Sequence, residues 1–265
     1  MRIAGKVFVV TGAGNGIGRQ VSLKLLDQGA LVAGVDLNEK GLAETARLGA
    51  AEERFSAYVV NITDREAVDA LPAAIESVHG RIDAVVNIAG VIQKFVKVVD
   101  LPFSEIEKVM NVNFWGTMNM VKAFLPVLLA RPEASLVNVS SMGAYAPVPG
   151  QAVYGASKAA VKVLTEALYA ELIDTNVAVT VIFPGAIGTE IAANSGVALG
   201  DASADAPAYK TTTPVEAARV IVESIEKGRF RATIGGDAAT MDRISRLSPK
   251  TATTMIAKRM GALLD

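Results

Sequence analysis

The sequence predicts an α/β fold in which a parallel sheet carries helices on both faces. Short apolar runs rich in β-branched residues recur along the chain, and their hydrophobicity is continuous rather than alternating, as is typical of strands buried on both faces. Helical patterns with capping residues lie between these runs. Right-handed helical crossovers then give a three-layer, doubly wound parallel sheet of about seven strands, a Rossmann-like architecture.

The expected elements follow one another in a regular order. The strand-like runs are 7–10, 31–35, 57–60, 84–88, 136–139, 178–183 and a weaker 232–234. The helical patterns are the one through Leu26, then 63–78, 114–129, 152–173 and 213–227. Segment 192–210, rich in Ala, Gly, Ser and Asp, is expected to be a substrate loop with a short helix, and 237–265 a C-terminal helical extension.

Composition narrows the class of protein. At 265 residues the chain fits one domain, 1–265. Its 26 basic and 27 acidic residues nearly cancel, so no nucleic-acid partner is expected. The absence of cysteine excludes a disulfide framework, a thiolate nucleophile and a Cys-ligated zinc. The single histidine, His79, is expected to cap a helix C-terminus, so neither a metal site nor a Ser-His-Asp hydrolase is expected.

No membrane span is expected either. The mean hydropathy is +0.36, but charges or prolines interrupt each long apolar stretch. The first apolar run, 7–10, is soon followed by a glycine-rich turn and is too short for a signal peptide. We therefore expect a cytoplasmic protein.

A glycine-rich turn follows the first strand and opens a helix. Glycines in this context let backbone N–H groups approach a pyrophosphate closely, although a plain tight turn is the alternative interpretation. The spacing departs from G-x-G-x-x-G, and no Gly-Lys-Ser/Thr follows it, which excludes a Walker loop. The turn predicts a dinucleotide site formed by Gly12, Gly14, Asn15, Gly16, Ile17 and Gly18.

Asp36 ends the second strand-like run and predicts which dinucleotide binds. A carboxylate at this place accepts hydrogen bonds from both ribose hydroxyls and repels a 2′-phosphate. Neither Asn15 nor Leu37 supplies the positive charge that a 2′-phosphate requires. The cofactor is therefore expected to be NAD, the alternative being that Asp36 only caps the strand end.

Tyr154 and Lys158 are four residues apart at the start of the helix after the fifth strand, so both side chains project from one helix face. An ammonium about 4 Å from a phenol contributes roughly 4 kcal/mol at an effective dielectric of about 20, which lowers the pKa of the tyrosine. Ser141, at the end of the fifth strand, is placed to polarise the same substrate oxygen, although a serine there is ordinarily a turn residue.

The glycine turn, the segment Asn87-Ile88-Ala89-Gly90 and the later polar residues together resemble the classical short-chain dehydrogenase/reductase family over about residues 5–235. The resemblance implies an enzyme that transfers a hydride between NAD and a secondary alcohol or ketone. It implies Tyr154 as general acid/base, Ser141 holding the substrate oxygen, and Lys158 lowering the tyrosine pKa and bonding the nicotinamide ribose. Asn113 would support a proton relay.

The resemblance implies further cofactor contacts. Asn61 and Ile62 would lie near adenine, and Asn87, Ala89 and Gly90 along the adenosine. The nicotinamide carboxamide would be surrounded by Pro184, Gly185, Ile187 and Thr189, with Leu37 beside Asp36. The chain departs from the family with Asn61, where aspartate is common, and Ile88, where a second asparagine is common. The carbonyl oxygen of Asn61 remains able to accept from an adenine amine.

Apolar residues surround the expected substrate pocket, so a hydrophobic small-molecule alcohol or ketone is the expected substrate. They are Met142, Ala144, Tyr145, Val148, Pro149, Ile187, Ile191 and Ala192. The main alternative is a non-catalytic NAD(H)-binding sensor, which would not need Ser141, Tyr154 and Lys158. A lyase or dehalogenase on this fold resembles the family but loses the glycine turn, which is intact here.

Helices 152–173 and 114–129 are apolar on more than one face, more than one sheet can bury. They predict a homo-oligomer interface, as in the tetramers and dimers that this family commonly makes, and a homotetramer is the first expectation. The alternative is that the C-terminal segment covers them. Whether the C-terminal extension packs on a neighbouring subunit or stays loose is left open by the sequence.

Overall fold

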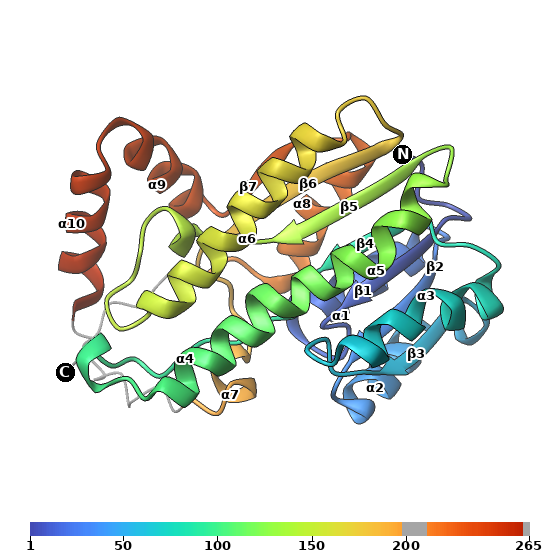
Figure 1. The fold of residues 1–265 in the computed structure, drawn as a ribbon, viewed down its shortest axis with the longest axis horizontal. Coiled ribbons are helices and arrows are strands. Elements are labelled where there is room, and N and C mark those ends of the chain that lie inside the picture. Colours follow the sequence, from blue (N-terminus) through green and yellow to red (C-terminus); the bar gives the residue numbers. More distant parts are fainter. Residues whose placement is uncertain (198–210, 262–265) are drawn as a thin grey trace.

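The computed structural model describes residues 1–197 and 211–261 of the chain. Its centre is a seven-stranded sheet of order β3-β2-β1-β4-β5-β6-β7, in which every neighbouring pair is parallel (Figure 1). This confirms the predicted doubly wound fold. The strands are β1 (Val7–Thr11), β2 (Leu31–Asp36), β3 (Phe55–Val59), β4 (Ala84–Asn87), β5 (Ala134–Val139), β6 (Val177–Pro184) and β7 (Arg231–Ile234).

The helices alternate with the strands along the chain. The longer helices are α1 (Gly16–Asp27), α2 (Glu39–Gly49), α3 (Arg65–His79), α4 (Phe103–Met110), α5 (Thr117–Leu129), α6 (Ala152–Glu171), α8 (Pro214–Glu226), α9 (Gly236–Leu247) and α10 (Pro249–Met260). The short ones are η1 (Glu52–Arg54), η2 (Val98–Asp100), η3 (Asn111–Gly116), η4 (Met142–Ala144) and α7 (Ile191–Asn194).

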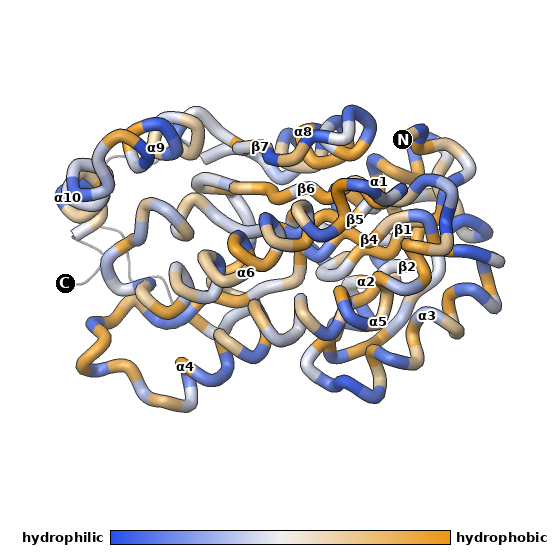
Figure 2. The backbone as a smooth tube through the Cα atoms, turned by 45° about the horizontal axis from the view of Figure 1, so that its top comes forward, coloured by the Kyte–Doolittle hydropathy of each residue, from blue (hydrophilic) through white to orange (hydrophobic). Residues whose placement is uncertain are grey.

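Two apolar layers hold the sheet between the helices. One face is packed against α1, α2 and α8 through residues such as Leu25, Leu42 and Ile221. The other is packed against α3, α5 and α6 through residues such as Leu71 and Phe124. Figure 2 shows the apolar residues gathered along the central strands β4, β5 and β6. All residues of β1, β4 and β5 are buried, which explains their continuous hydrophobicity.

Helix ends follow local capping chemistry, with one correction. Asp64 caps α3 by accepting from the N–H of Ala67, and Thr213 caps α8 by accepting from Glu216. At the other end of α3 the cap is Gly80, whose φ of +73° suits glycine, and not His79 as expected. His79 is the last helical residue, and its Nε2 lies 2.7 Å from Ser56 Oγ.

The C-terminal extension folds back on its own chain as two helices, α9 and α10, that lie together at one end of the molecule (Figure 1). Met241 and Ile256 pack with Ala146, just after η4, so the extension contacts the segment between β5 and α6. Residues 198–210 of the expected substrate loop and 262–265 of the extension lie outside the described residues. None of the described helices is long and apolar enough to cross a membrane.

Candidate active site

The turn between β1 and α1 leaves no room for side chains at two of its glycines. Gly12 has a φ of +73°, and a Cβ there would lie 3.1 Å from the main chain of Ala89. A Cβ on Gly18 would lie 2.0 Å from the carbonyl oxygen of Gly12. Asn15 caps α1 by accepting from the N–H of Gly16. The turn therefore brings the positive end of α1 close to any ligand above it.

The turn borders a cavity of about 390 Å³ at the carboxyl ends of β1, β2 and β4. Ligands of doubly wound sheets bind outside this edge, where the strand order reverses. Residues from six separate parts of the chain meet there. The predicted cofactor residues that line the cavity are Gly12, Asn15, Gly16, Ile17, Gly18, Asp36, Leu37, Asn61, Ile62, Ala89, Gly90 and Thr189.

Asp36 belongs to the lining and also has a structural task. Its Oδ2 accepts from the N–H of Gly14 at 2.9 Å, and its Oδ1 accepts from the N–H of Asn38 at 2.9 Å. A carboxylate has about four lone-pair sites, so two main-chain donors leave acceptor capacity on the cavity side. The strand-end cap and a ribose contact are therefore compatible.

The remaining predicted cofactor residues lie outside the cavity lining. Asn87 donates through Nδ2 to Asn138 at 2.8 Å, while its buried Oδ1 has no partner among the described residues. An unpaired buried acceptor can take a hydrogen bond from a bound ligand, and Asn87 stands three residues before Gly90 of the cavity lining. The other predicted cofactor residues that lie outside the cavity lining are Gly14, Tyr154, Lys158, Pro184, Gly185 and Ile187.

Asp237, in the first turn of α9, holds the turn after β6 and was not identified from the sequence. Its Oδ2 accepts from the N–H of Ala186 at 2.8 Å. A Cβ on Gly185 would lie 2.2 Å from its Oδ1, so a side chain at that position would displace the Asp237 carboxylate. The contact spans 51 residues of chain, and the sequence around Asp237 only suggests a helix start.

Asn61 is oriented by its own loop. Its Oδ1 accepts from both the N–H and the hydroxyl of Thr63, at 3.0 and 2.9 Å. This is the oxygen that is expected from the sequence to accept a hydrogen bond from an adenine amine. In the structure it closes a local turn instead, and any adenine contact through it would be additional.

Tyr154 and Ser141 meet at the end of β5. Tyr154 lies in the first turn of α6, and Ser141 accepts from the N–H of Gly143 at 3.0 Å to cap η4. Burial raises the pKa of the Tyr154 phenol, and its hydrogen bond with Ser141 opposes that rise. The two hydroxyls therefore lie within hydrogen-bonding distance of each other.

Lys158 is not among the groups that shift the pKa of Tyr154. It is buried, and its Nζ donates to the carbonyl oxygen of Val139 at 3.0 Å. Burial lowers the pKa of Lys158 to about 8. The sequence predicts that the ammonium lowers the pKa of Tyr154, but in the structure burial of the phenol raises this pKa and the hydrogen bond with Ser141 opposes the rise. The Nζ does face the cavity edge, since a Cβ on Gly90 would lie 3.1 Å away.

Asn113 lies in η3, a π-helical turn between α4 and α5, and both polar atoms of its side chain are hydrogen-bonded within the protein. Its Oδ1 accepts from the N–H of Val91 at 2.8 Å. Its Nδ2 donates to Val91 O and to Ser157 Oγ, both at 2.9 Å. Ser157 in turn donates to the carbonyl oxygen of Tyr154. The side chain therefore ties the segment after β4 to α6.

Apolar side chains pack around Tyr154, and one of them, Ile191, also lines the cavity. Ile92, Ala192 and Val197 form a cluster with the partly buried Phe95, Tyr154 and Ile191. A second cluster, including Met142, Tyr145 and Val148, joins the region to α9 and α10. Glu190, also missed by the sequence analysis, accepts from Asn15 Nδ2 at 2.8 Å and so spans the cavity between α7 and the glycine turn.

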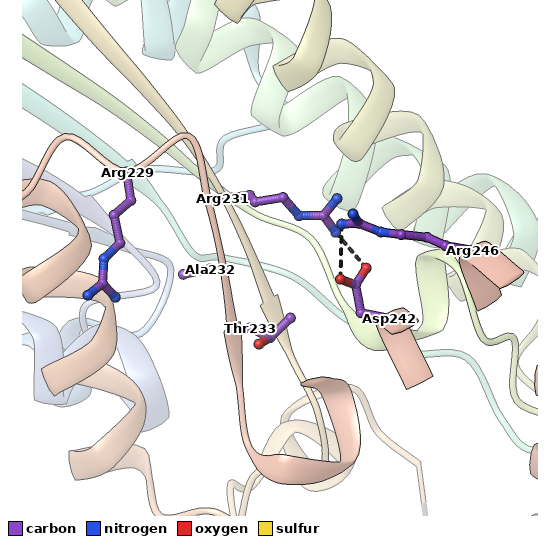
Figure 3. A pocket seen from close by; sticks show the side chains of 6 residues that line it. All are labelled: Arg229, Arg231, Ala232, Thr233, Asp242 and Arg246. Carbon is purple, nitrogen blue, oxygen red and sulfur yellow. Dashed lines mark hydrogen bonds and ion pairs between the residues drawn. The ribbon is translucent and has the colours of Figure 1, made fainter. Parts of the chain in front are cut away.

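A second hollow lies at the edge strand β7 and contains none of these residues. Figure 3 shows its lining of Arg229, Arg231, Ala232, Thr233, Asp242 and Arg246. Asp242 forms ion pairs with Arg231 at 2.7 Å and with Arg246 at 3.0 Å. These three charged side chains of the hollow are therefore paired with one another. Within residues 1–197 and 211–261 no cluster of three His, Asp or Glu side chains is arranged to hold a metal ion.

Comparison with known proteins agrees with this geometry. Residues 6–198 match the short chain dehydrogenase family. SadH of Mycobacterium tuberculosis is 36% identical over 261 residues, 96% of this chain and 94% of SadH. A short chain dehydrogenase/reductase of Burkholderia phymatum in complex with NAD superposes with a TM-score of 0.85 at 25% identity, covering 95% of this chain and 96% of that one. A Burkholderia cenocepacia short chain dehydrogenase in complex with NADP has a TM-score of 0.82 at 26% identity, covering 97% and 99%.

This chain therefore belongs to the short-chain dehydrogenase/reductase family.

Proposed function

We propose that this protein is an NAD-dependent dehydrogenase/reductase that interconverts a secondary alcohol and its ketone. The observation that carries the proposal is the meeting of Tyr154, Ser141 and Lys158 beside a cavity formed by the glycine-rich turn. A protein that only senses a dinucleotide has no use for a phenol and a hydroxyl that converge next to its binding cavity.

Each side chain has a task in this reaction. Ser141 donates to the substrate oxygen and holds it against the phenol, and Tyr154 exchanges the hydroxyl proton with that oxygen. Lys158, fixed on Val139, offers its remaining N–H groups to ribose hydroxyls at the cavity edge near Gly90. Asn113 holds the segment after β4 against α6. When bound, NAD supplies the acceptor for the hydride leaving the carbinol carbon, and its positive ring favours the phenolate.

NAD rather than NADP is proposed because of the charge at the adenosine end of the cavity. The Asp36 carboxylate lies there, next to Leu37, whose side chain is 66% exposed and uncharged. A 2′-phosphate would meet this carboxylate without a compensating cation among the cavity-lining residues, which include no Lys or Arg. The described part of the chain therefore favours a free 2′-hydroxyl.

A hydrophobic substrate is proposed because apolar side chains surround Tyr154. Ile92, Phe95 and Ile191 pack on one side of it, and Met142 and Val148 lie towards the C-terminal helices. Burying apolar substrate surface against these residues provides binding energy that polar substrates would not gain.

We propose a homo-oligomer, tetramer or dimer, because large apolar side chains are exposed on the outer face of α6, in the turn that follows it and in η3. Val163 on α6 is 61% exposed, Ile173 in the turn that follows α6 is 63% exposed, and Trp115 in η3 is 44% exposed. The C-terminal helices contact β7 and η4, so the alternative cover for this face is not seen in the described residues. The cytoplasmic location stays a prediction.

The test is a titration of the purified protein with NADH and, separately, with NADPH, followed by turnover with secondary alcohols. Binding stabilises the native state by mass action, so nicotinamide fluorescence and thermal stabilisation should agree. We expect NADH to bind at least about 10-fold more tightly, equivalent to about 1.4 kcal/mol. Binding without turnover of any alcohol or ketone would favour the sensor instead.

A further inference from the structure

The start of α6 has no cap from its own sequence. Gln151, at the N-cap position, makes no side-chain hydrogen bond to the helix. The first-turn N–H groups of Val153 and Tyr154 are therefore in need of an acceptor from elsewhere in the chain. This helix end carries the phenol on which the proposed reaction depends.

The acceptor comes from the segment after β4. Oε1 of Gln93 accepts from the N–H of Val153 at 2.9 Å and from the N–H of Tyr154 at 3.0 Å. Its Nε2 donates to the carbonyl oxygen of Gly150 at 2.9 Å. The side chain thus uses its acceptor and one donor on the chain entering and beginning α6, 57 to 61 residues away in sequence.

The contact is reciprocal and enclosed. Nε2 of Gln151 donates to the main-chain carbonyl of Gln93 at 2.6 Å, so the two glutamines hold each other's segments. Gln93 is 0% exposed, which means that it is not part of an open substrate surface. Just before it, Val91 is fixed on both its N–H and its carbonyl by Asn113. The capping side chain is therefore attached to a rigid support.

We infer that Gln93 is a positioning residue that caps the catalytic helix and sets the place of the Tyr154 phenol relative to Ser141. The inference rests on the proposed function. Loss of the cap frees the first turn of α6, which contains Tyr154, while Lys158 lies one turn further on and stays anchored to Val139. Proton transfer is then impaired more than dinucleotide binding. A displacement of about 1 Å at a reacting group costs on the order of 100-fold in rate.

Two variants separate positioning from general stability. Gln93→Leu removes the acceptor and the donor at similar size. Gln93→Glu keeps an acceptor for both N–H groups at the positive end of the helix, but it replaces the donor to Gly150 with a second oxygen and introduces a carboxyl group at a buried position. Lys94→Met, at the adjacent exposed position, is the matched control.

The experiment measures kcat and KM with NAD and a panel that includes 2-octanol and cyclohexanol, together with the Kd for NADH. We expect Gln93→Leu to lower kcat 10- to 100-fold with an NADH Kd within about 2-fold of the parent. Gln93→Glu should keep a higher kcat than Gln93→Leu because it retains the acceptor, and Lys94→Met should match the parent. Parental kcat in Gln93→Leu, or equal impairment of the Glu and Leu variants, would overturn the inference.

Amide hydrogen exchange provides a readout that does not depend on turnover. The amides of 152–156 should exchange faster in Gln93→Leu than in the parent or Lys94→Met, while those of 163–170 should not change. Unchanged exchange at 152–156 would overturn the cap. If the parent protein turns over no member of the panel but exchange increases as expected, the proposed function fails and the cap stands.

Discussion

The carboxylate of Asp36 accepts a hydrogen bond from the main-chain N–H of Gly14 at 2.9 Å, across 22 residues of chain. This contact joins the end of β2 to the glycine-rich turn and fixes one negative charge at the rim of the cavity. A Cβ on Gly14 would lie 3.0 Å from the same carboxylate, so the close approach depends on glycine.

Replacing Asp36 should therefore change cofactor choice. In Asp36→Ala we expect the ratio of the NADPH and NADH dissociation constants to fall from at least about 10 to near 1, because the repulsion of a 2′-phosphate and the ribose acceptor are both lost. Fluorescence titration with each nucleotide measures the ratio. Glu39→Gln, which removes an exposed carboxylate nearby, should keep the parental ratio. A strong NADH preference in Asp36→Ala would assign the preference to another residue.

Removing the Tyr154 hydroxyl should abolish proton transfer. Tyr154→Phe is expected to lower kcat by about 10²- to 10⁴-fold and to leave the NADH Kd within about 2-fold, since the ring still fills its place among Ile92 and Phe95. Steady-state kinetics and nucleotide titration check the two values. The matched control is Tyr169→Phe, on the same helix, which should retain parental kcat. Substantial turnover by Tyr154→Phe would contradict an acid/base role.

Lys158 should make folding stability depend on alkaline pH. Its folded pKa of about 8 lies below the unfolded value, because burial disfavours the ammonium. Below pH 8 both states carry the proton and the folded state bears the full penalty. Between about pH 8 and 10.5 the unfolded state binds more protons, so the stability rises with pH.

The variant Lys158→Met lacks this titration. The difference in unfolding free energy between Lys158→Met and the parent should therefore change by about 3 kcal/mol in favour of the parent from pH 7.5 to 10.5. Urea unfolding without nucleotide at several pH values measures it. A constant difference across this window would show that Lys158 titrates at its ordinary pKa.

Asp83 should stabilise the fold without affecting the site. It is 0% exposed at the amino end of β4, opposite the cavity, and accepts from the N–H of Val7 at 2.9 Å and from Arg131 at 3.0 Å. Asp83→Asn leaves the arginine without its counter-charge, and we expect a loss of about 3 kcal/mol in unfolding free energy with unchanged NADH Kd. Glu133→Gln, which removes a half-exposed partner of Lys6, should cost less than about 1 kcal/mol. Equal effects of the two changes would contradict this assignment.

Charges on the outer face of α6 and in the turn that follows it should dissociate the proposed oligomer. The double variant Val163→Glu/Ile173→Glu is expected to sediment as a monomer at micromolar concentration, whereas the parent sediments as a tetramer or dimer. Val78→Glu, on the exposed side of α3, is the control and should keep the parental mass. A monomeric parent would refute the interface.

The strands, the glycine-rich turn and the alternation of helix and strand were predictable because their signals are local. A buried strand must be apolar throughout, and Gly12 and Gly18 are required by backbone atoms that lie within the same few residues or on the adjoining strand end. The pairing of Tyr154 with Lys158 on one helix face follows from helical geometry alone. The convergence of Asp36 and Gly90 at one cavity follows from the edge at which parallel strands end.

Other features depended on contacts between distant segments. In the sequence nothing marks Gln93 as a cap, yet its side-chain amide caps α6. Asp237 is identifiable in the sequence only as a helix start, yet it also holds the turn after β6. The pKa values of Tyr154 and Lys158 are shifted chiefly by burial, which no sequence spacing reveals. The sequence by itself determined the fold, the glycine-rich turn and the residue types of the proposed site. Only the tertiary structure decided which polar atoms are paired and which are buried, because hydrogen bonding and desolvation depend on neighbours brought together by folding.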